Sequence, residues 1–78
     1  MTNREKYIDI FSKIFEVEPD KLPGLTYNSI SSWDSVGHMA LVTNLENTFD
    51  IMLDTDDILN LNSFEKGMEI LGKYDIQF

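Results

Sequence analysis

The chain has 78 residues, 42% of them apolar, and a formal net charge of −8 at pH 7. This length predicts one domain over residues 1–78, and the apolar share is enough for a small core and too high for a disordered chain. The chain has no cysteine and one histidine, which excludes a disulfide framework and argues against a transition-metal site.

Negative charge dominates the middle of the chain, where no Lys or Arg occurs between Lys21 and Lys66. This base-free interval holds seven acidic residues: Asp34, Glu46, Asp50, Asp54, Asp56, Asp57 and Glu65. The charge argues against nucleic acid as a partner, because the phosphates would repel it. Two interpretations stay open: a solvated surface that keeps the protein soluble, or a field that steers basic protein partners to this region.

The hydropathy pattern gives no sign of a membrane or secretory segment. No run approaches the roughly 18 apolar residues of a membrane span. The residues after Met1 are polar and lack the apolar run of a signal peptide. We therefore expect a cytoplasmic protein that does not insert into membranes and is monomeric.

The first predicted helix covers residues 3–15. Thr2 and Glu5 have the spacing of a capping box, and Pro19 ends any continuation of the helix. The apolar residues of this segment recur at three- and four-residue steps: Tyr7, Ile8, Phe11, Ile14 and Phe15. Val17 and Leu22 are expected to fold back onto the core.

A long loop is predicted over residues 23–33, which are rich in turn-forming residues. Leu25, Ile30 and Trp33 are expected to anchor it by burying apolar surface. A loop of this length in so small a domain needs a reason, either a functional position or a return path along a parallel neighbour.

A second helix is predicted over residues 35–49, with Ser35 at its start. Its apolar residues follow helical spacing: Val36, Met39, Leu41, Val42, Leu45 and Phe49. Gly37 in the first turn lowers helix propensity by about 1 kcal/mol relative to Ala. Gly37 either lets another molecule approach closely beside Ser35, or it is a weak position that the helix tolerates.

Two shorter helices complete the predicted fold. Asp54 caps the third, whose first turn is acidic and which includes the apolar residues Ile58, Leu59 and Leu61. Ser63 caps the fourth, over residues 64–74, in which Gly67 weakens the helix and permits close packing. The pattern predicts an all-α four-helix bundle with a short third helix and a long loop between helices one and two.

Catalytic and metal-binding patterns are weak. Ser35 and His38 would share a helix face, but no G-x-S-x-G elbow or preceding strand accompanies them, which argues against a hydrolase. His38 is instead expected to be a partly exposed surface residue. The acids from Asp54 to Asp57 lack the alternation and the glycine of an EF-hand loop, so capping and surface acidity explain them better.

Ser35 remains as the candidate site, with two interpretations. Its hydroxyl can accept a hydrogen bond from the free N–H groups of the first helical turn, as a cap does. It can also serve as an exposed attachment point, where the helix dipole would favour a phosphate ester. The two roles are compatible.

The segment Asp34-Ser35-Val36, at the start of a helix after a long loop, resembles the Asp-Ser-Leu motif of acyl carrier proteins. The resemblance covers nearly the whole chain and includes its length, its acidity and the Leu-Glu-x-x-Phe stretch at Leu45–Phe49. It implies that Ser35 carries 4′-phosphopantetheine, transferred from coenzyme A by a phosphopantetheinyl transferase. The thiol of this arm holds acyl or aminoacyl groups as thioesters, so the protein is a carrier and not an enzyme.

The resemblance also implies partner and cargo residues. Partner enzymes with basic docking surfaces, which load or consume the acyl group, are expected to contact Asp34, Val36, Met39, Thr43, Glu46 and Asp56. An interior space for an acyl chain would be lined by Val42, Leu45, Leu53, Ile58, Leu61 and Met68. The alternative hypothesis is a small acidic helical protein-interaction module without a prosthetic group.

The sequence also departs from the family pattern. Val36 replaces the usual Leu. Members that serve bacterial fatty-acid synthesis usually carry acids where this chain has Gly37, Ala40 and Asn47. Trp33 before the motif and Gly37-His38 after it look more like carriers of specialised pathways or stand-alone aminoacyl carriers than like the housekeeping fatty-acid carrier.

Overall fold

The computed structural model describes residues 1–78, which form four α-helices, one 3₁₀-helix and no β-strand. The elements are α1 (Asn3–Phe15), η1 (Pro19–Lys21), α2 (Ser35–Phe49), α3 (Thr55–Asn60) and α4 (Phe64–Gly72). The all-α class and the bounds of α1 and α2 are as predicted. The fourth helix ends before the predicted Tyr74, because residues 73–75 continue as tight turns in which each N–H bonds to the carbonyl three residues earlier.

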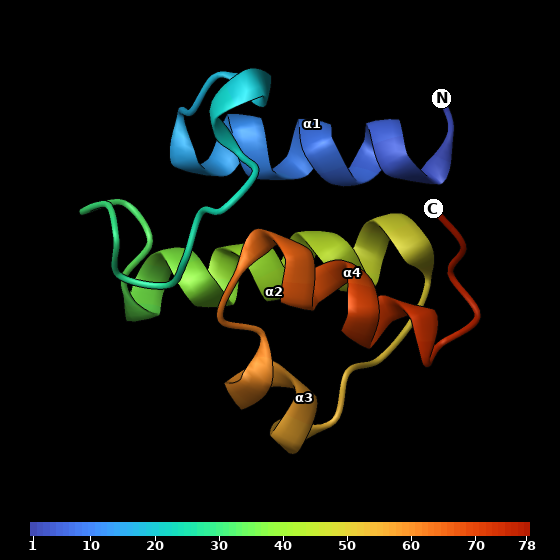
Figure 1. Ribbon diagram of the computed structural model, residues 1–78. Coiled ribbons are helices and arrows are strands. Elements are labelled where there is room, and N and C mark those ends of the chain that lie inside the picture. The colour runs from blue at the N-terminus through green and yellow to red at the C-terminus, as the bar shows by residue number, and fades with distance from the viewer.

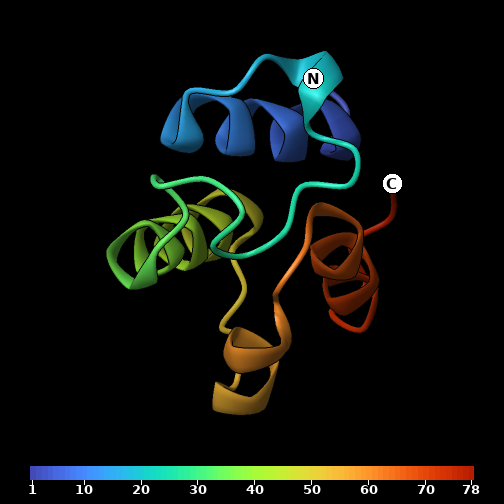
Figure 2. The same ribbon diagram turned by 60° about the vertical axis from the view of Figure 1, so that its left-hand side comes forward.

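The helices are arranged in two levels with α3 beneath them (Figure 1). Helix α1 lies across the top and packs on α2, which runs in the opposite direction (Figure 1). The turned view shows α2 and α4 side by side below α1, with α3 on the side away from α1 (Figure 2). None of the helices has the length and apolarity needed to cross a membrane.

Side chains cap the N-termini of α1, α3 and α4 as expected. Thr2 and Glu5 form a reciprocal capping box on α1. Asp54 accepts the Asp57 N–H at the start of α3, and Ser63 accepts the Lys66 N–H at the start of α4. Each cap satisfies a backbone donor that has no partner within its helix.

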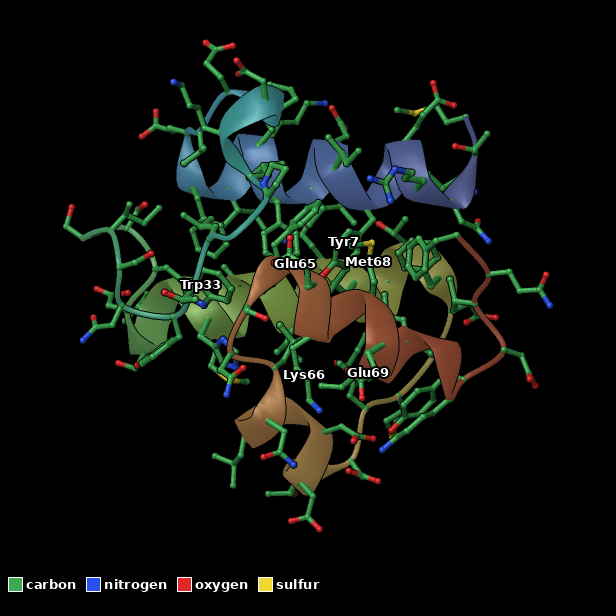
Figure 3. All side chains as sticks on the ribbon, viewed as in Figure 1. Tyr7, Trp33, Glu65, Lys66, Met68 and Glu69 are labelled. Atoms are coloured by element: carbon green, nitrogen blue, oxygen red, sulfur yellow. The ribbon has the colours of Figure 1, made fainter.

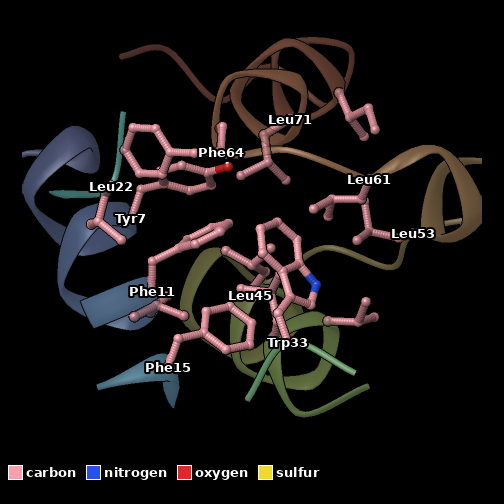
Figure 4. Close-up of a cluster of buried hydrophobic side chains, with 14 residues drawn as sticks. Tyr7, Phe11, Phe15, Leu22, Trp33, Leu45, Leu53, Leu61, Phe64 and Leu71 are labelled. Atoms are coloured by element: carbon pink, nitrogen blue, oxygen red, sulfur yellow. Dashed lines mark hydrogen bonds between the residues drawn. The ribbon is translucent and has the colours of Figure 1, made fainter. Parts of the chain in front are cut away.

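The core is built around aromatic side chains from α1 and the loop. Trp33 is fully buried and stacks on Phe15, with ring centroids 4.9 Å apart. Figure 4 shows the indole between the aromatic side chains of α1 and the leucines Leu53 and Leu61. The expectation that Trp33 anchors the loop is confirmed.

The loop between η1 and α2 is tied to the connection between α3 and α4. Tyr27 N–H donates to the Asn62 carbonyl at 2.8 Å, and Phe64 N–H donates to the Leu25 carbonyl at 2.9 Å. Gly24, which has a φ of 85°, donates its N–H to the Glu65 carboxylate. The loop is long because it crosses from α1 to this connection and then returns to the start of α2.

Helix α4 approaches α1 closely at Gly67. The Tyr7 side chain points from α1 toward α4 (Figure 3), and its hydroxyl donates to the Phe64 carbonyl at 2.7 Å. Burial, with a smaller contribution from the Glu65 charge, raises the pKa of this phenol far above its ordinary value. A Cβ at position 67 would collide with the Tyr7 hydroxyl, so the predicted close packing at this glycine is confirmed.

Gly67→Ala should therefore destabilise the protein by about 1–3 kcal/mol, the usual cost of overpacking a dense core. The higher helix propensity of alanine offsets at most about 1 kcal/mol of this loss. Urea unfolding measures the difference. Gly72→Ala is the matched control, since the space around Gly72 is open and this change should be neutral or slightly stabilising. Equal stabilities of the two variants would contradict the packing argument.

Candidate functional site beside Ser35

Ser35 is the first residue of α2, and its side chain is exposed. The cap of this helix is Asp34, whose carboxylate accepts the Gly37 N–H at 2.8 Å. The suggestion that the serine itself caps the helix is thus wrong. Because the Asp34 carboxylate provides the cap, the Ser35 hydroxyl remains available for other chemistry.

Gly37 leaves room for the chain's own loop. A Cβ at this position would collide with the Ser32 carbonyl oxygen and would lie 3.3 Å from the ring of Phe15. The idea that the glycine admits another molecule beside Ser35 is therefore wrong. Its absence of a side chain lets the end of the loop lie directly against the first turn of α2.

A pocket of about 360 Å³ opens beside Ser35, between α2, α3 and the loop. Its wall consists of Tyr27, Ser35, His38, Met39, Ile58, Leu59, Leu61 and Asn62. Most of this wall is apolar, and none of its side chains carries a carboxylate, an amine or a guanidinium. The serine hydroxyl thus lies at the boundary between solvent and a largely apolar cavity.

His38 links three segments around this pocket. The Trp33 indole Nε1–H donates to His38 Nδ1 at 3.1 Å, and His38 Nε2 lies 2.8 Å from the Ile58 carbonyl oxygen. The imidazole thereby joins the loop, α2 and α3. It is half-buried and bonded at both nitrogens, so describing it as a partly exposed surface residue misses its structural role.

Five of the six predicted partner-contact residues lie on the surface: Asp34, Val36, Met39, Thr43 and Asp56. Val36 is 78% exposed, which is unusual for a large aliphatic side chain. The sixth, Glu46, is half-buried, and its carboxylate accepts the Leu53 N–H at 2.9 Å. Glu46 is therefore held by the connection between α2 and α3.

The six residues predicted to line an acyl-chain space do not surround one cavity. Ile58 and Leu61 line the pocket beside Ser35, whereas Val42, Leu45 and Leu53 are buried in the core. Met68 lies on α4, where its sulfur contacts the Arg4 guanidinium at 3.6 Å. The pocket residues that were not among the predicted site residues are Tyr27, His38, Leu59 and Asn62.

Asp57 has an environment that its sequence position did not reveal. It is 3% exposed, and its carboxylate accepts hydrogen bonds from Lys73 Nζ and the Tyr74 hydroxyl, both at 2.6 Å. These bonds hold the pKa of the Asp57 carboxyl below its usual range and raise the pKa of Lys73. Surface acidity is therefore the wrong description of this residue, which fixes α3 to the end of α4.

A second, more polar pocket of about 210 Å³ lies between α3 and α4. Lys66 and Glu69 lie on the face of α4 toward α3 (Figure 3), and their charged groups are 3.4 Å apart. Lys73 and Asp57 also line this pocket and pair with each other. Its charges are thus already matched within the chain.

The residues around Ser35 are compatible with the phosphopantetheine group that the sequence resemblance implies. The hydroxyl is exposed at the N-terminus of a 15-residue helix, whose dipole favours a negatively charged ester. The adjoining apolar pocket can receive an uncharged chain. No protein-family model, curated protein or solved structure matches this chain.

Asp34→Ala should lower the free energy of unfolding by about 1 kcal/mol, the usual effect of removing an N-cap side chain. Ser35→Ala should change it by less than about 0.5 kcal/mol, because the serine is exposed and does not cap the helix. Urea denaturation of both variants tests whether Asp34 caps the helix and Ser35 does not. A larger loss for Ser35→Ala than for Asp34→Ala would contradict it.

Asp57→Asn should destabilise the protein at pH 7, because the buried group no longer carries the charge that pairs with Lys73. A carboxyl whose pKa is lowered on folding contributes stability above its unfolded pKa and loses it as the pH falls through its folded pKa. The difference between wild type and variant should therefore shrink below about pH 4. Chemical unfolding from pH 7 to pH 3 measures it. The exposed neighbour provides the control, and Asp56→Asn should have little effect at either pH.

Proposed function

We propose that the chain is an acyl carrier protein, a small four-helix-bundle carrier without catalytic activity of its own. The observation that carries the proposal is the exposed Ser35 hydroxyl in the first turn of α2, beside an apolar pocket and relieved of capping by Asp34. The likeness of Asp34-Ser35-Val36 to the Asp-Ser-Leu motif supports it. The attached group is 4′-phosphopantetheine, whose thiol supplies the thioester chemistry.

Attachment is a phosphoryl-transfer reaction at Ser35. The hydroxyl oxygen attacks the pantetheine-bearing phosphorus of the coenzyme A pyrophosphate, and a P–O bond of that pyrophosphate breaks. Adenosine 3′,5′-bisphosphate leaves, and the hydroxyl proton passes to a base of the phosphopantetheinyl transferase. The exposure of Ser35 and its freedom from capping support access to the transferase.

The surface around Ser35 is suited to brief contacts with a series of enzymes. Val36 and Met39 provide exposed apolar area, and Asp34 and Asp56 provide negative charge without a competing Lys or Arg in the same interval. Complementary charge increases the rate of encounter with basic surfaces. A small apolar contact favours rapid release, which a carrier needs after each transfer.

The cargo is an acyl or aminoacyl group of a specialised cytoplasmic pathway. The pocket beside Ser35 can accept the first part of an apolar chain against Ile58 and Leu61. The closed core around Val42 and Leu45 argues for a chain that stays in this outer pocket. The protein acts as a monomer and does not require a membrane or nucleic acid.

Mass spectrometry tests the proposal directly. Purified protein incubated with coenzyme A and a broad-specificity phosphopantetheinyl transferase should gain the mass of one phosphopantetheine group, and peptide fragmentation should place it on Ser35. Ser35→Ala should gain nothing. Ser31→Ala, which changes an exposed serine of the neighbouring loop, should be modified like the wild type.

An unmodified wild-type protein, in a reaction that loads a known carrier, would overturn the proposal. So would modification that persists in Ser35→Ala. An unmodified protein would favour the alternative that the exposed apolar residues Val36 and Leu59 permit, a helical interaction module without a prosthetic group. Persistent modification of Ser35→Ala would instead place the group on another residue.

A further inference from the structure

We propose that His38 is a proton-sensitive latch that fastens the loop carrying Trp33 to the pocket beside Ser35. In its neutral form the imidazole joins the loop to α2 and α3, and on protonation it releases the loop and keeps its contact with α3. The inference rests on the hydrogen bonds of His38 and does not require Ser35 to carry any group.

The two partners of the imidazole allow only one protonation state. The Trp33 indole N–H is a donor without acceptor capacity, so His38 Nδ1 must present its lone pair. The Ile58 carbonyl oxygen is an acceptor only, so His38 Nε2 must carry the hydrogen. The neutral Nε2–H tautomer is therefore the only form that satisfies both contacts.

Protonation changes only one side of this arrangement. A hydrogen on Nδ1 faces the indole N–H, so two donors oppose each other and the Trp33–His38 bond is lost. The bond from Nε2 to Ile58 remains and strengthens, because its donor is now charged. The indole is completely buried, so its N–H is left without a partner unless the loop moves.

Tyr27 connects this event to the wall of the pocket. Its ring packs edge-on against both His38 and Trp33, with centroid distances of 5.5 Å and 6.3 Å. Tyr27 and His38 both line the pocket beside Ser35. Displacement of the indole therefore loosens the side of the pocket formed by the loop and leaves the side formed by α3 in place.

His38 is the only histidine of the chain, and histidine is the side chain that ordinarily changes its charge between pH 5 and 8. The titratable groups on the elements around it are Tyr27 on the loop, Asp34 before α2, Glu46 on α2, and Asp54, Asp56 and Asp57 at the start of α3. None of them bonds to the imidazole: Asp34 accepts the Gly37 N–H, and Asp57 binds Lys73 and Tyr74. The Trp33–His38 bond thus has no charged side chain of the chain as a competing partner at the imidazole.

Solvent exchange of the single indole N–H, followed by NMR from pH 8 to pH 5, tests the latch. His38→Gln is the matched variant, since a glutamine amide offers both an acceptor and a donor but does not titrate. At pH 8 the indole N–H should exchange at similar rates in the wild type and in His38→Gln. At pH 5 the wild-type indole N–H should exchange on the order of tenfold faster than that of His38→Gln, which corrects for the intrinsic effect of pH.

Two further measurements distinguish release of the loop from a change in the charge of His38 alone. The amides of Tyr27 and Asn28 should lose protection with the same midpoint, whereas those of Ile58 and Leu61 should keep theirs. His38→Phe removes both hydrogen bonds, so its indole N–H should exchange quickly at every pH. If His38→Phe does not fold, the comparison between wild type and His38→Gln still tests the proposal.

Equal indole exchange in wild type and His38→Gln across the whole range would overturn the inference. Loss of protection throughout α3 together with the loop would also overturn it, because it would indicate general unfolding. In Ser35→Ala, exchange of the indole N–H should depend on pH as it does in the wild type. Failure of the latch and failure of Ser35 to be modified are therefore separate results.

Discussion

The buried indole of Trp33 is the constraint to which the rest of the structure is fitted. Its ring fills the space between the aromatic residues of α1 and the leucines near α3, and its N–H needs an acceptor there (Figure 4). His38, the fourth residue of α2, supplies that acceptor. The loop must therefore deliver Trp33 directly before α2, and this requirement places Asp34 and Ser35 at the helix start, outside the core.

Helix α3 depends on polar contacts at both of its sides. It has six residues, too few for a helix to be stable by itself in water. Asp57 fastens it to Lys73 and Tyr74 after α4, while the Ile58 carbonyl oxygen fastens it to His38 on α2. One wall of the pocket is thus held by a few hydrogen bonds, one ion pair and the packing of Ile58 and Leu61 with the core. The opposite end of the molecule rests on dense aromatic packing.

Features set by neighbouring residues were predictable from the sequence. The capping box at Thr2, the cap at Asp54 and the extents of α1 and α2 all follow from local spacing. The partners of Asp57 and Glu46 were not predictable in this way. Lys73 is 16 residues from Asp57, and the same acid in a first helical turn would equally suit an exposed surface.

His38 and Gly37 illustrate the same limit at the site itself. Helical spacing places His38 beside Ser35, but nothing in the spacing shows that the indole of Trp33 and a carbonyl of α3 converge on its ring. Gly37 was recognised as unfavourable for a helix, while the group that needs the space, the Ser32 carbonyl, comes from the loop. Residues of the pocket that come from the loop and α3 meet only through the tertiary fold, so no periodicity identifies them.

The separation of roles between Asp34 and Ser35 has an energetic consequence for the proposed modification. A phosphodiester on Ser35 would add negative charge to a chain whose net charge is already −8. Near the N-terminus of α2 the helix dipole would stabilise it by about 0.3–1 kcal/mol. Repulsion by an exposed neighbouring carboxylate such as Asp34 is of similar size, about 1 kcal/mol at 4 Å in water. The two effects nearly cancel, so a group could be added to or removed from Ser35 with little effect on folding. A serine that also capped the helix would lose this independence, because its modification would disturb the hydrogen bond that starts α2.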